Sequence, residues 1–154
     1  MVFLPRSQGH RLVSHATIDA LVAYYEKLDR ESLGEMGRYY AAECYFKDPF
    51  NEVRTLPEIQ AIFERMYRHL ADPRFRVTER IEEGKSGVLV WDFDFRMRAW
   101  QPATARRIHG VTLLKFDAAG KVNYHRDYWD AAEELYEKLP LIGPLMRGLR
   151  RYVR

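Results

Sequence analysis

An aspartate in an aromatic setting is the first candidate for chemistry in this sequence. Asp48 follows Tyr45 and Phe46 and precedes Pro49 and Phe50. A carboxyl group held against apolar walls is costly to ionise, so its pKa rises and it can take up and return a proton. An aspartate before a proline also commonly caps a turn without any further role. The residues alone leave both interpretations of Asp48 open.

A second candidate group lies towards the end of the sequence. His125, Asp127 and Trp129 are spaced two apart, so in a strand their side chains point to the same face. If that face lines a cavity, the imidazole and the carboxylate can exchange a proton near neutral pH. The alternative is a purely structural pair, with the other face of the strand lining the cavity. That other face would carry Tyr124, Arg126, Tyr128 and Asp130.

Periodicity predicts the elements that must position these residues. Apolar residues recur at helical spacing from Thr17 to Leu28, which predicts a first helix. A short second helix is expected over residues 30–40. Thr55 and Glu58 form a capping box for a third helix, which stops before Asp72-Pro73. Strands are expected at residues 43–47, 75–81, 88–100, 106–116 and 121–129, and a further helix at residues 130–138.

This order of elements is typical of an α+β fold in which helices gather on one face of an antiparallel sheet. A strongly curved sheet would wrap around the N-terminal helices as a cone and leave a pocket at its open end. The strand at residues 88–100 would place one face in the core and form cross-strand ion pairs with the other, while His109 would face away from the pocket. The core face carries Trp91, Phe93, Phe95 and Met97, and the charged face carries Asp92, Asp94, Arg96 and Arg98.

Length and composition limit the possible classes. The 154 residues suit one domain. We predict this domain at residues 14–138, a loosely held arm at residues 1–13 and an amphipathic helical tail at residues 139–154. The net charge is +3, but residues 140–154 hold four arginines and no acid, so the rest is close to neutral and no nucleic-acid surface is expected. The tail is expected to pack within a dimer; contact with an anionic membrane surface is the less favoured alternative.

The sequence gives no sign of export, membrane spanning or metal binding. Pro5 and Arg6 interrupt any signal peptide, and no stretch approaches the roughly 20 apolar residues of a membrane span, so we expect a cytoplasmic protein. The single Cys44 rules out an internal disulfide framework and a multi-cysteine zinc site. We expect neither a metal nor a cofactor, because no glycine-rich phosphate loop and no metal-ligand spacing is present.

From about residue 15 to 135, the chain resembles the NTF2-like, or SnoaL-like, superfamily. Ketosteroid isomerases, polyketide cyclases and limonene epoxide hydrolases belong to it, as do many binding proteins. The most specific stretch runs from Tyr24 through Asp48-Pro49 into residues 59–66, and it aligns with a ketosteroid isomerase without a gap. The resemblance implies the cone-shaped fold described above and a homodimer formed through the sheet.

The resemblance also implies roles for individual residues. Asp48 falls on the proton-shuttling aspartate of the isomerases, and Tyr24 on the tyrosine that donates to the developing enolate oxygen. Thr112 falls where an isomerase has its second acid; it can donate a hydrogen bond but cannot act as a strong acid, which argues against steroid isomerisation. Asp127, with His125 beside it, resembles the general acid/base of the SnoaL-like cyclases.

The expected function is therefore a cofactor-independent isomerase or cyclase that moves a proton on a small, apolar, carbonyl-bearing compound. A non-catalytic binding or assembly module is the main alternative, because a fold does not fix a function. An epoxide hydrolase is the third, with Asp48, Asp127 and an arginine such as Arg106 imitating an Asp–Arg–Asp set that activates water. The residues expected to shape the substrate pocket are Phe46, Phe63, Met66, Thr112 and Trp129.

Overall fold

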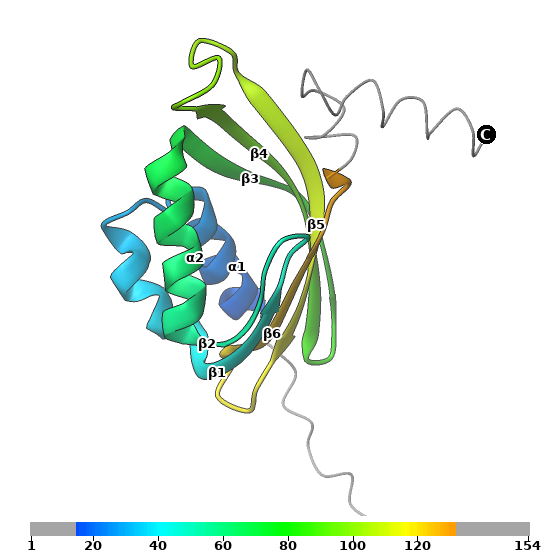
Figure 1. Ribbon diagram of the computed structural model, residues 1–154. Coiled ribbons are helices and arrows are strands. Elements are labelled where there is room, and N and C mark those ends of the chain that lie inside the picture. The colour runs from blue at the N-terminus through cyan, green and yellow to red at the C-terminus, as the bar shows by residue number, and fades with distance from the viewer. Residues whose placement is uncertain (1–14, 132–154) are drawn as a thin grey trace, which may run out of the picture.

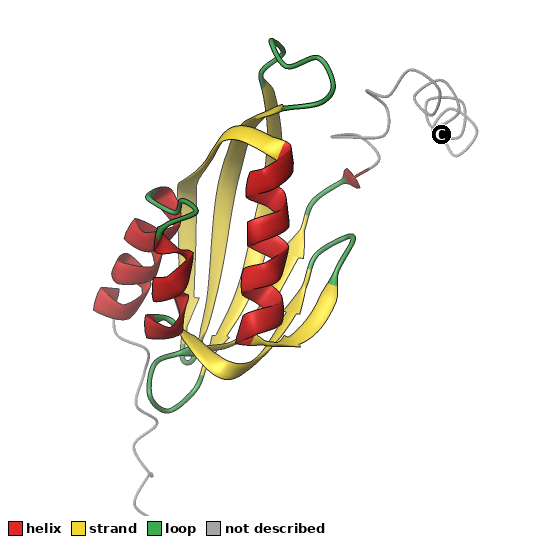
Figure 2. Ribbon diagram, turned by 60° about the vertical axis from the view of Figure 1, so that its left-hand side comes forward, coloured by secondary structure: helices red, strands yellow, loops and turns green. Residues whose placement is uncertain are grey.

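A curved, open six-stranded sheet carries the helices on its concave side in the computed structural model (Figure 1), which describes residues 15–131. The fold is α+β, as predicted. Figure 2 shows α2 lying across the concave face of the sheet. The elements, in chain order, are α1 (His15–Glu26), η1 (Ser32–Arg38), β1 (Tyr40–Lys47), β2 (Glu52–Thr55), α2 (Leu56–His69), β3 (Leu70–Glu83), β4 (Ser86–Met97), β5 (Arg106–Phe116) and β6 (Val122–Tyr128).

The strand order is β2-β1-β6-β5-β4-β3, and one pair departs from the predicted antiparallel sheet. β1 and β6 run parallel, with Phe46 opposite His125, whereas every other neighbouring pair is antiparallel. A parallel pair needs a long connection, and α2 with β3–β5 provides one between β1 and β6. This pairing brings the segment around Asp48 beside the end of the last strand.

The start of α2 follows the predicted capping box. The Glu58 carboxylate accepts from the Thr55 backbone N–H at 3.0 Å and from the Thr55 hydroxyl at 2.7 Å. The helix ends earlier than predicted, at His69, and β3 continues through Asp72-Pro73 instead of starting after it. A shift of register between Ala71 and Arg74, with Asp72 at φ 52, accommodates the proline, which has no N–H for the ladder.

The segment before α2 also differs from the prediction. The expected second helix is a 3-10 helix that stops at Arg38, and Tyr40 already belongs to β1. The four-residue edge strand β2 was not predicted, because only Val53 in it is apolar and half-buried. The predicted arm, the amphipathic tail and nearly all of the helix from Asp130 lie outside the described residues. Within residues 15–131, every helix is too short or too polar to span a bilayer.

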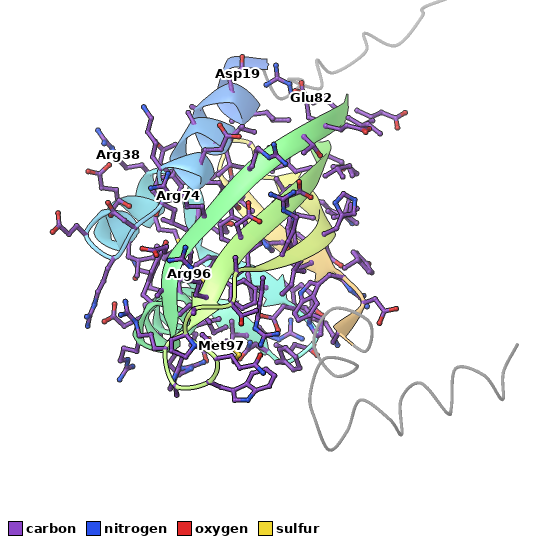
Figure 3. The ribbon with its side chains drawn as sticks, turned by 90° about the horizontal axis from the view of Figure 1, so that it is seen from above. Asp19, Arg38, Arg74, Glu82, Arg96 and Met97 are labelled. Carbon is purple, nitrogen blue, oxygen red and sulfur yellow. The ribbon has the colours of Figure 1, made fainter. Side chains whose placement is uncertain are left out.

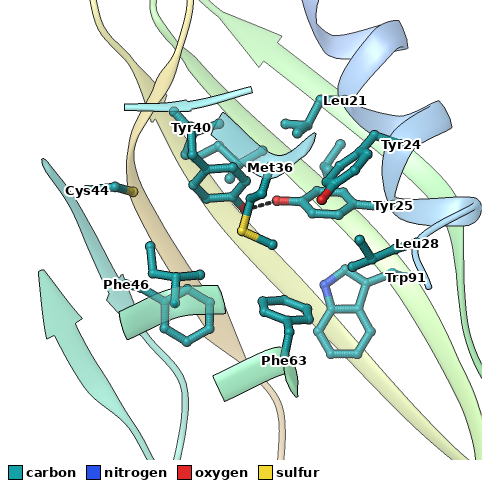
Figure 4. Close-up of a cluster of buried hydrophobic side chains, with 14 of the residues drawn as sticks. Leu21, Tyr24, Tyr25, Leu28, Met36, Tyr40, Cys44, Phe46, Phe63 and Trp91 are labelled. Carbon is teal, nitrogen blue, oxygen red and sulfur yellow. Dashed lines mark hydrogen bonds between the residues drawn. The ribbon is translucent and has the colours of Figure 1, made fainter. Parts of the chain in front are cut away.

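The core lies between the helices and the concave face of the sheet (Figure 4). Residues from α1, α2, β1, β4, β5 and β6 are buried in one cluster, and partly buried residues of β3 pack against it. As predicted, Trp91, Phe93 and Phe95 point inwards from β4 and are buried. Tight packing of this kind provides most of the stability of a domain of this size, since buried apolar area is the dominant favourable term.

The outer face of β4 carries the predicted ion pairs. Asp92 pairs with Arg76 of β3 at 2.6 Å and with His109 of β5 at 2.9 Å, so His109 does face away from the core. Arg107 binds both oxygens of Asp94, at 2.6 and 2.9 Å. Arg96 pairs with Asp72, but Arg98 donates to the Leu70 carbonyl oxygen instead of forming an ion pair.

We expect the contribution of Asp92 to stability to disappear in acid. The His109 imidazole and the Arg76 guanidinium hold the pKa of the Asp92 carboxyl below its usual value of 3.8. A pKa depressed in the folded state gives stability above the unfolded pKa, and that stability is lost as the pH falls through the folded pKa. Asp92→Asn should therefore be less stable than wild type at about pH 6, and the difference should shrink below about pH 4.

Urea denaturation at a series of pH values measures this difference directly. Asp19→Asn is a suitable control, because Asp19 pairs only with the exposed Arg80 on the far edge of the sheet. An Asp92→Asn deficit that stayed constant down to about pH 3 would contradict the assignment.

Candidate functional site

An apolar cavity of about 450 Å³ lies between α2 and the concave face of the sheet. Carboxylates reach it from the ends of β1 and β6, at Asp48 and Asp127, and Arg65 and His69 reach it from α2. The rest of its wall is almost entirely apolar, which is typical of a site for a small organic ligand. Four residues predicted to shape a pocket line this cavity: Phe46, Phe63, Met66 and Trp129.

A second, much smaller cavity of about 20 Å³ adjoins the first, and buried polar groups line this smaller cavity. The two share Phe63, Phe75, Trp91 and Asp127 in their walls. The smaller cavity adds three polar side chains from α1, β5 and β6: Tyr25, Thr112 and His125. The apolar cavity therefore has a polar inner end, and Asp127 lies where the two meet.

Asp127 is held by two hydrogen-bond donors on the same oxygen. His125 Nε2 lies 2.9 Å from Asp127 Oδ1, and the Thr112 hydroxyl donates to that oxygen at 2.5 Å. No residue within 15–131 hydrogen-bonds to Oδ2, although the Asp127 side chain is only 18% exposed. Since Asp127 lines the large cavity, Oδ2 is the oxygen available to a ligand. The structure thus places the His125–Asp127–Trp129 face of β6 inwards.

Two buried phenols fix the tautomer of His125. The Tyr40 hydroxyl lies 2.7 Å and the Tyr25 hydroxyl 3.3 Å from Nδ1, and the two hydroxyls hydrogen-bond to each other (Figure 4). Burial raises the pKa of both phenols well above 10, so both keep their protons. We infer that Tyr40 donates to Nδ1 and that Nε2 carries the proton donated to Asp127.

Trp91 sets the direction of the Thr112 hydroxyl. The indole Nε1–H donates to Thr112 Oγ1 at 2.7 Å, so the hydroxyl proton of Thr112 is free to point at Asp127. The indole lies directly over Gly110, where a Cβ atom would collide with its outer ring carbons. The two groups that donate to Asp127, from His125 and Thr112, are therefore each oriented by a further hydrogen bond, as expected for a preorganised carboxylate.

Asp48 caps a turn, which is one of the two interpretations of the sequence, and it also lies in the cavity wall. Its carboxylate caps the turn after β1, where Oδ1 accepts from the backbone N–H groups of Phe50 and Asn51, each at 2.7 Å. The Asn51 side-chain amide contacts both oxygens, at 3.0 and 2.9 Å. Asp48 also lines the cavity, but both of its oxygens are engaged.

Tyr24 does not reach either cavity, contrary to the expectation drawn from the resemblance. Its hydroxyl donates to the Ser32 carbonyl oxygen at 3.1 Å, and its ring stacks on Tyr39 with centroids 4.4 Å apart. Successive residues of a helix point about 100° apart, so only one of Tyr24 and Tyr25 can face His125. That residue is Tyr25. Tyr25 lies on the apolar face of the helix predicted from Thr17 to Leu28, Trp91 belongs to the predicted core face of its strand, and Tyr40 is the last residue of the predicted second helix. Nothing in the sequence distinguishes these three aromatic residues from other core residues.

No cluster of three or more potential metal-binding side chains of histidine, cysteine or acidic residues occurs within residues 15–131.

The model of the SnoaL-like domain matches residues 21–125, well over half of the chain. The chain belongs to the SnoaL-like domain family. A search of the curated proteins found no match for it.

Solved structures share the fold of this SnoaL-like chain at low sequence identity. A hypothetical protein from Catenulispora acidiphila, with a ketosteroid isomerase-like fold and trimethylamine bound, is 14% identical over 79% of this chain and 91% of its own, with a TM-score of 0.66. A putative SnoaL-like polyketide cyclase from Shewanella denitrificans is 19% identical over 79% and 98%, with a TM-score of 0.65. An LEH-like epoxide hydrolase from M. tuberculosis is 13% identical over 90% and 92%, with a TM-score of 0.61. At these identities the likeness shows the fold alone.

Proposed function

We propose that this SnoaL-like protein catalyses a cofactor-independent proton transfer on a small, apolar, carbonyl-bearing compound, as an isomerase or a cyclase does. Asp127 is the general base and then the acid. One observation carries the proposal: Asp127 presents an uncommitted oxygen to an apolar cavity while two donors hold its other oxygen. This arrangement fixes a base in place without blocking it.

The reaction would proceed in two steps. Oδ2 of Asp127 removes a proton from the carbon next to the carbonyl group. The electrons of that C–H bond form a C=C bond, and the carbonyl π electrons move onto the oxygen, which gives an enolate. In an isomerase, Oδ2 of Asp127 then returns the proton to another carbon of the conjugated enolate. In a cyclase, the enolate carbon attacks a second carbonyl of the substrate and closes a ring, and Oδ2 returns the proton to the alkoxide that forms there. His125 and Thr112 act as positioning residues, because their donors keep Oδ1 fixed throughout.

The arginine geometry favours this chemistry over epoxide opening. Within residues 15–131, neither Asp48 nor Asp127 forms an ion pair with an arginine, whereas the epoxide hydrolase hypothesis needs an Asp–Arg–Asp set. Arg106, the arginine suggested for that set, donates to the Gln101 side chain at 2.8 Å and lies over the Trp100 ring. We therefore place the epoxide hydrolase function below proton transfer.

Hydrogen–deuterium exchange tests the proposal without a known substrate. A panel of cyclic ketones and enones would be incubated with the protein in D₂O, and loss of the α-proton signals would be followed by NMR. We expect the wild-type protein to accelerate exchange for at least one compound that the cavity accommodates. If compounds bind, as shown by calorimetry, but none exchanges faster than in buffer, the protein is a binding module instead.

A further inference from the structure

An arginine and a histidine in the cavity wall have no partner within residues 15–131. Arg65 and His69 lie one turn apart on α2, both line the large cavity, and neither side chain forms a hydrogen bond or ion pair with a described residue. Several other arginines do form ion pairs: Arg30 pairs with Glu64 at 2.6 Å, and Arg107 with Asp94. A free guanidinium beside an apolar cavity is available to a ligand.

Arg106 is a second arginine with an unsatisfied group, although its Nη2 donates to the Gln101 side chain. Its Nε is the single buried side-chain nitrogen or oxygen of residues 15–131 that lacks a hydrogen-bond partner. Arg106 is opposite Phe95 in the β4–β5 register and two residues before Ile108, and both of these line the cavity. Alternation therefore directs Arg106 to the concave face. A buried N–H without an acceptor is rare and calls for a specific explanation.

Arg106 and the end of α2 lie away from Asp127. Arg106 is six residues before Thr112 on β5, and the Thr112 hydroxyl donates to Asp127. The backbone N–H of Arg98 donates to the His69 carbonyl oxygen at 3.0 Å, which joins the end of α2 to the segment just after β4. Met97, which ends β4 and is labelled in Figure 3, lines the cavity beside them. His69 is six residues beyond Phe63, which lines both cavities, and that spacing is about 9 Å along a helix.

We propose that Arg65 and Arg106, with the neighbouring His69, form a cationic end that binds the oxyanion of an elongated substrate. The inference rests on the proposed function, which places the reacting carbonyl at Asp127. The substrate class is then an apolar carbonyl compound with a carboxylate, sulfate or phosphate group at the end remote from the reacting carbon. Guanidinium groups bind such oxyanions with two charge-assisted hydrogen bonds. A cavity without cations would instead disfavour burial of the charge.

A matched pair of ligands isolates this interaction. Naphthylacetate and naphthylethanol share one apolar body and differ in whether the end group is charged. Calorimetry on the full chain should show that wild type binds naphthylacetate about tenfold more tightly, as one charge-assisted contact allows. Arg65→Gln and Arg106→Gln should each reduce this preference, and the double variant should abolish it. The affinity for naphthylethanol should stay unchanged, which shows that the cavity is intact.

Arg68→Gln is the matched control, because Arg68 lies on the same helix and is exposed, as Arg65 is, but does not line the cavity. It should keep the full preference. Equal affinities of wild type for the two ligands, binding of neither, or an equal loss of preference in Arg68→Gln would each overturn the proposal. Asp127→Asn separates the two ideas: it should stop proton exchange yet leave the preference for naphthylacetate in place.

Discussion

Asp127→Asn should lower the rate of proton transfer by about 10²–10⁴-fold, which is the usual contribution of a general base. An amide cannot take a proton from carbon at neutral pH, so the step assigned to Oδ2 is lost. The fold should survive, because the amide oxygen can still accept from His125 and Thr112. The measurement is the rate of deuterium exchange into the best compound of the ketone panel, with thermal melting as a check on folding.

Asp48→Asn is the informative control for this experiment. The resemblance to ketosteroid isomerases predicts that Asp48 is the base, whereas we propose Asp127 for that role. The Asp48 carboxylate mainly accepts backbone and amide N–H groups, and an asparagine oxygen can still accept from the backbone N–H groups. We expect exchange to continue in this variant. Loss of exchange in Asp48→Asn together with full activity in Asp127→Asn would refute our assignment.

Gly110→Ala should destabilise the protein by about 1–3 kcal/mol, the usual cost of forcing extra volume into a packed core. The new methyl group would collide with the Trp91 indole, which is buried and covers Gly110. The indole would have to move, and its hydrogen bond to Thr112 would be lost. Thermal or urea denaturation measures the change, and each 1 kcal/mol should lower the Tm by about 2–4 °C for a domain of this size.

Gly34→Ala provides the comparison for the same chemical change. Gly34 lies in η1, and a Cβ atom there would meet nothing within 4 Å. That substitution should be neutral or slightly stabilising, because alanine restricts the unfolded chain more than glycine does. Equal stability of the two variants would show that Trp91 can be displaced freely. Its role in directing the Thr112 hydroxyl would then be untenable.

The Gly110 prediction illustrates where sequence reasoning loses its power. Any α+β domain could bury large aromatic residues such as Trp91, Tyr25 and Tyr40. Their positions in the sequence follow no spacing that would predict hydrogen bonds from their polar atoms. Only the packing of α1 against β1 and β6 places two phenols beside His125 Nδ1. Likewise, only the β4–β5 register places an indole N–H beside Thr112.

Local rules account for what the sequence determined by itself. Strict alternation in β4, the capping box at Thr55 and the spacing of His125 and Asp127 depend on the periods of strands and helices, which are the same in every fold. They were enough to predict the α+β architecture, the outer ion pairs and the inward aromatic face of β4. The family resemblance, which the SnoaL-like domain match supports, then indicated which acidic residues to expect at a site.

The tertiary structure decided what depends on contacts between distant segments. It made β1 and β6 a parallel pair, turned His125 and Asp127 inwards, and put Tyr25 in the position expected of Tyr24. It also left Asp48 with both oxygens engaged and Asp127 with one uncommitted. The physical reason is that a carboxylate's availability depends on every donor within about 3 Å. One donor to Asp127 comes from the neighbouring strand β5, and the other, His125, is itself contacted by Tyr25, which is 100 residues away along the chain.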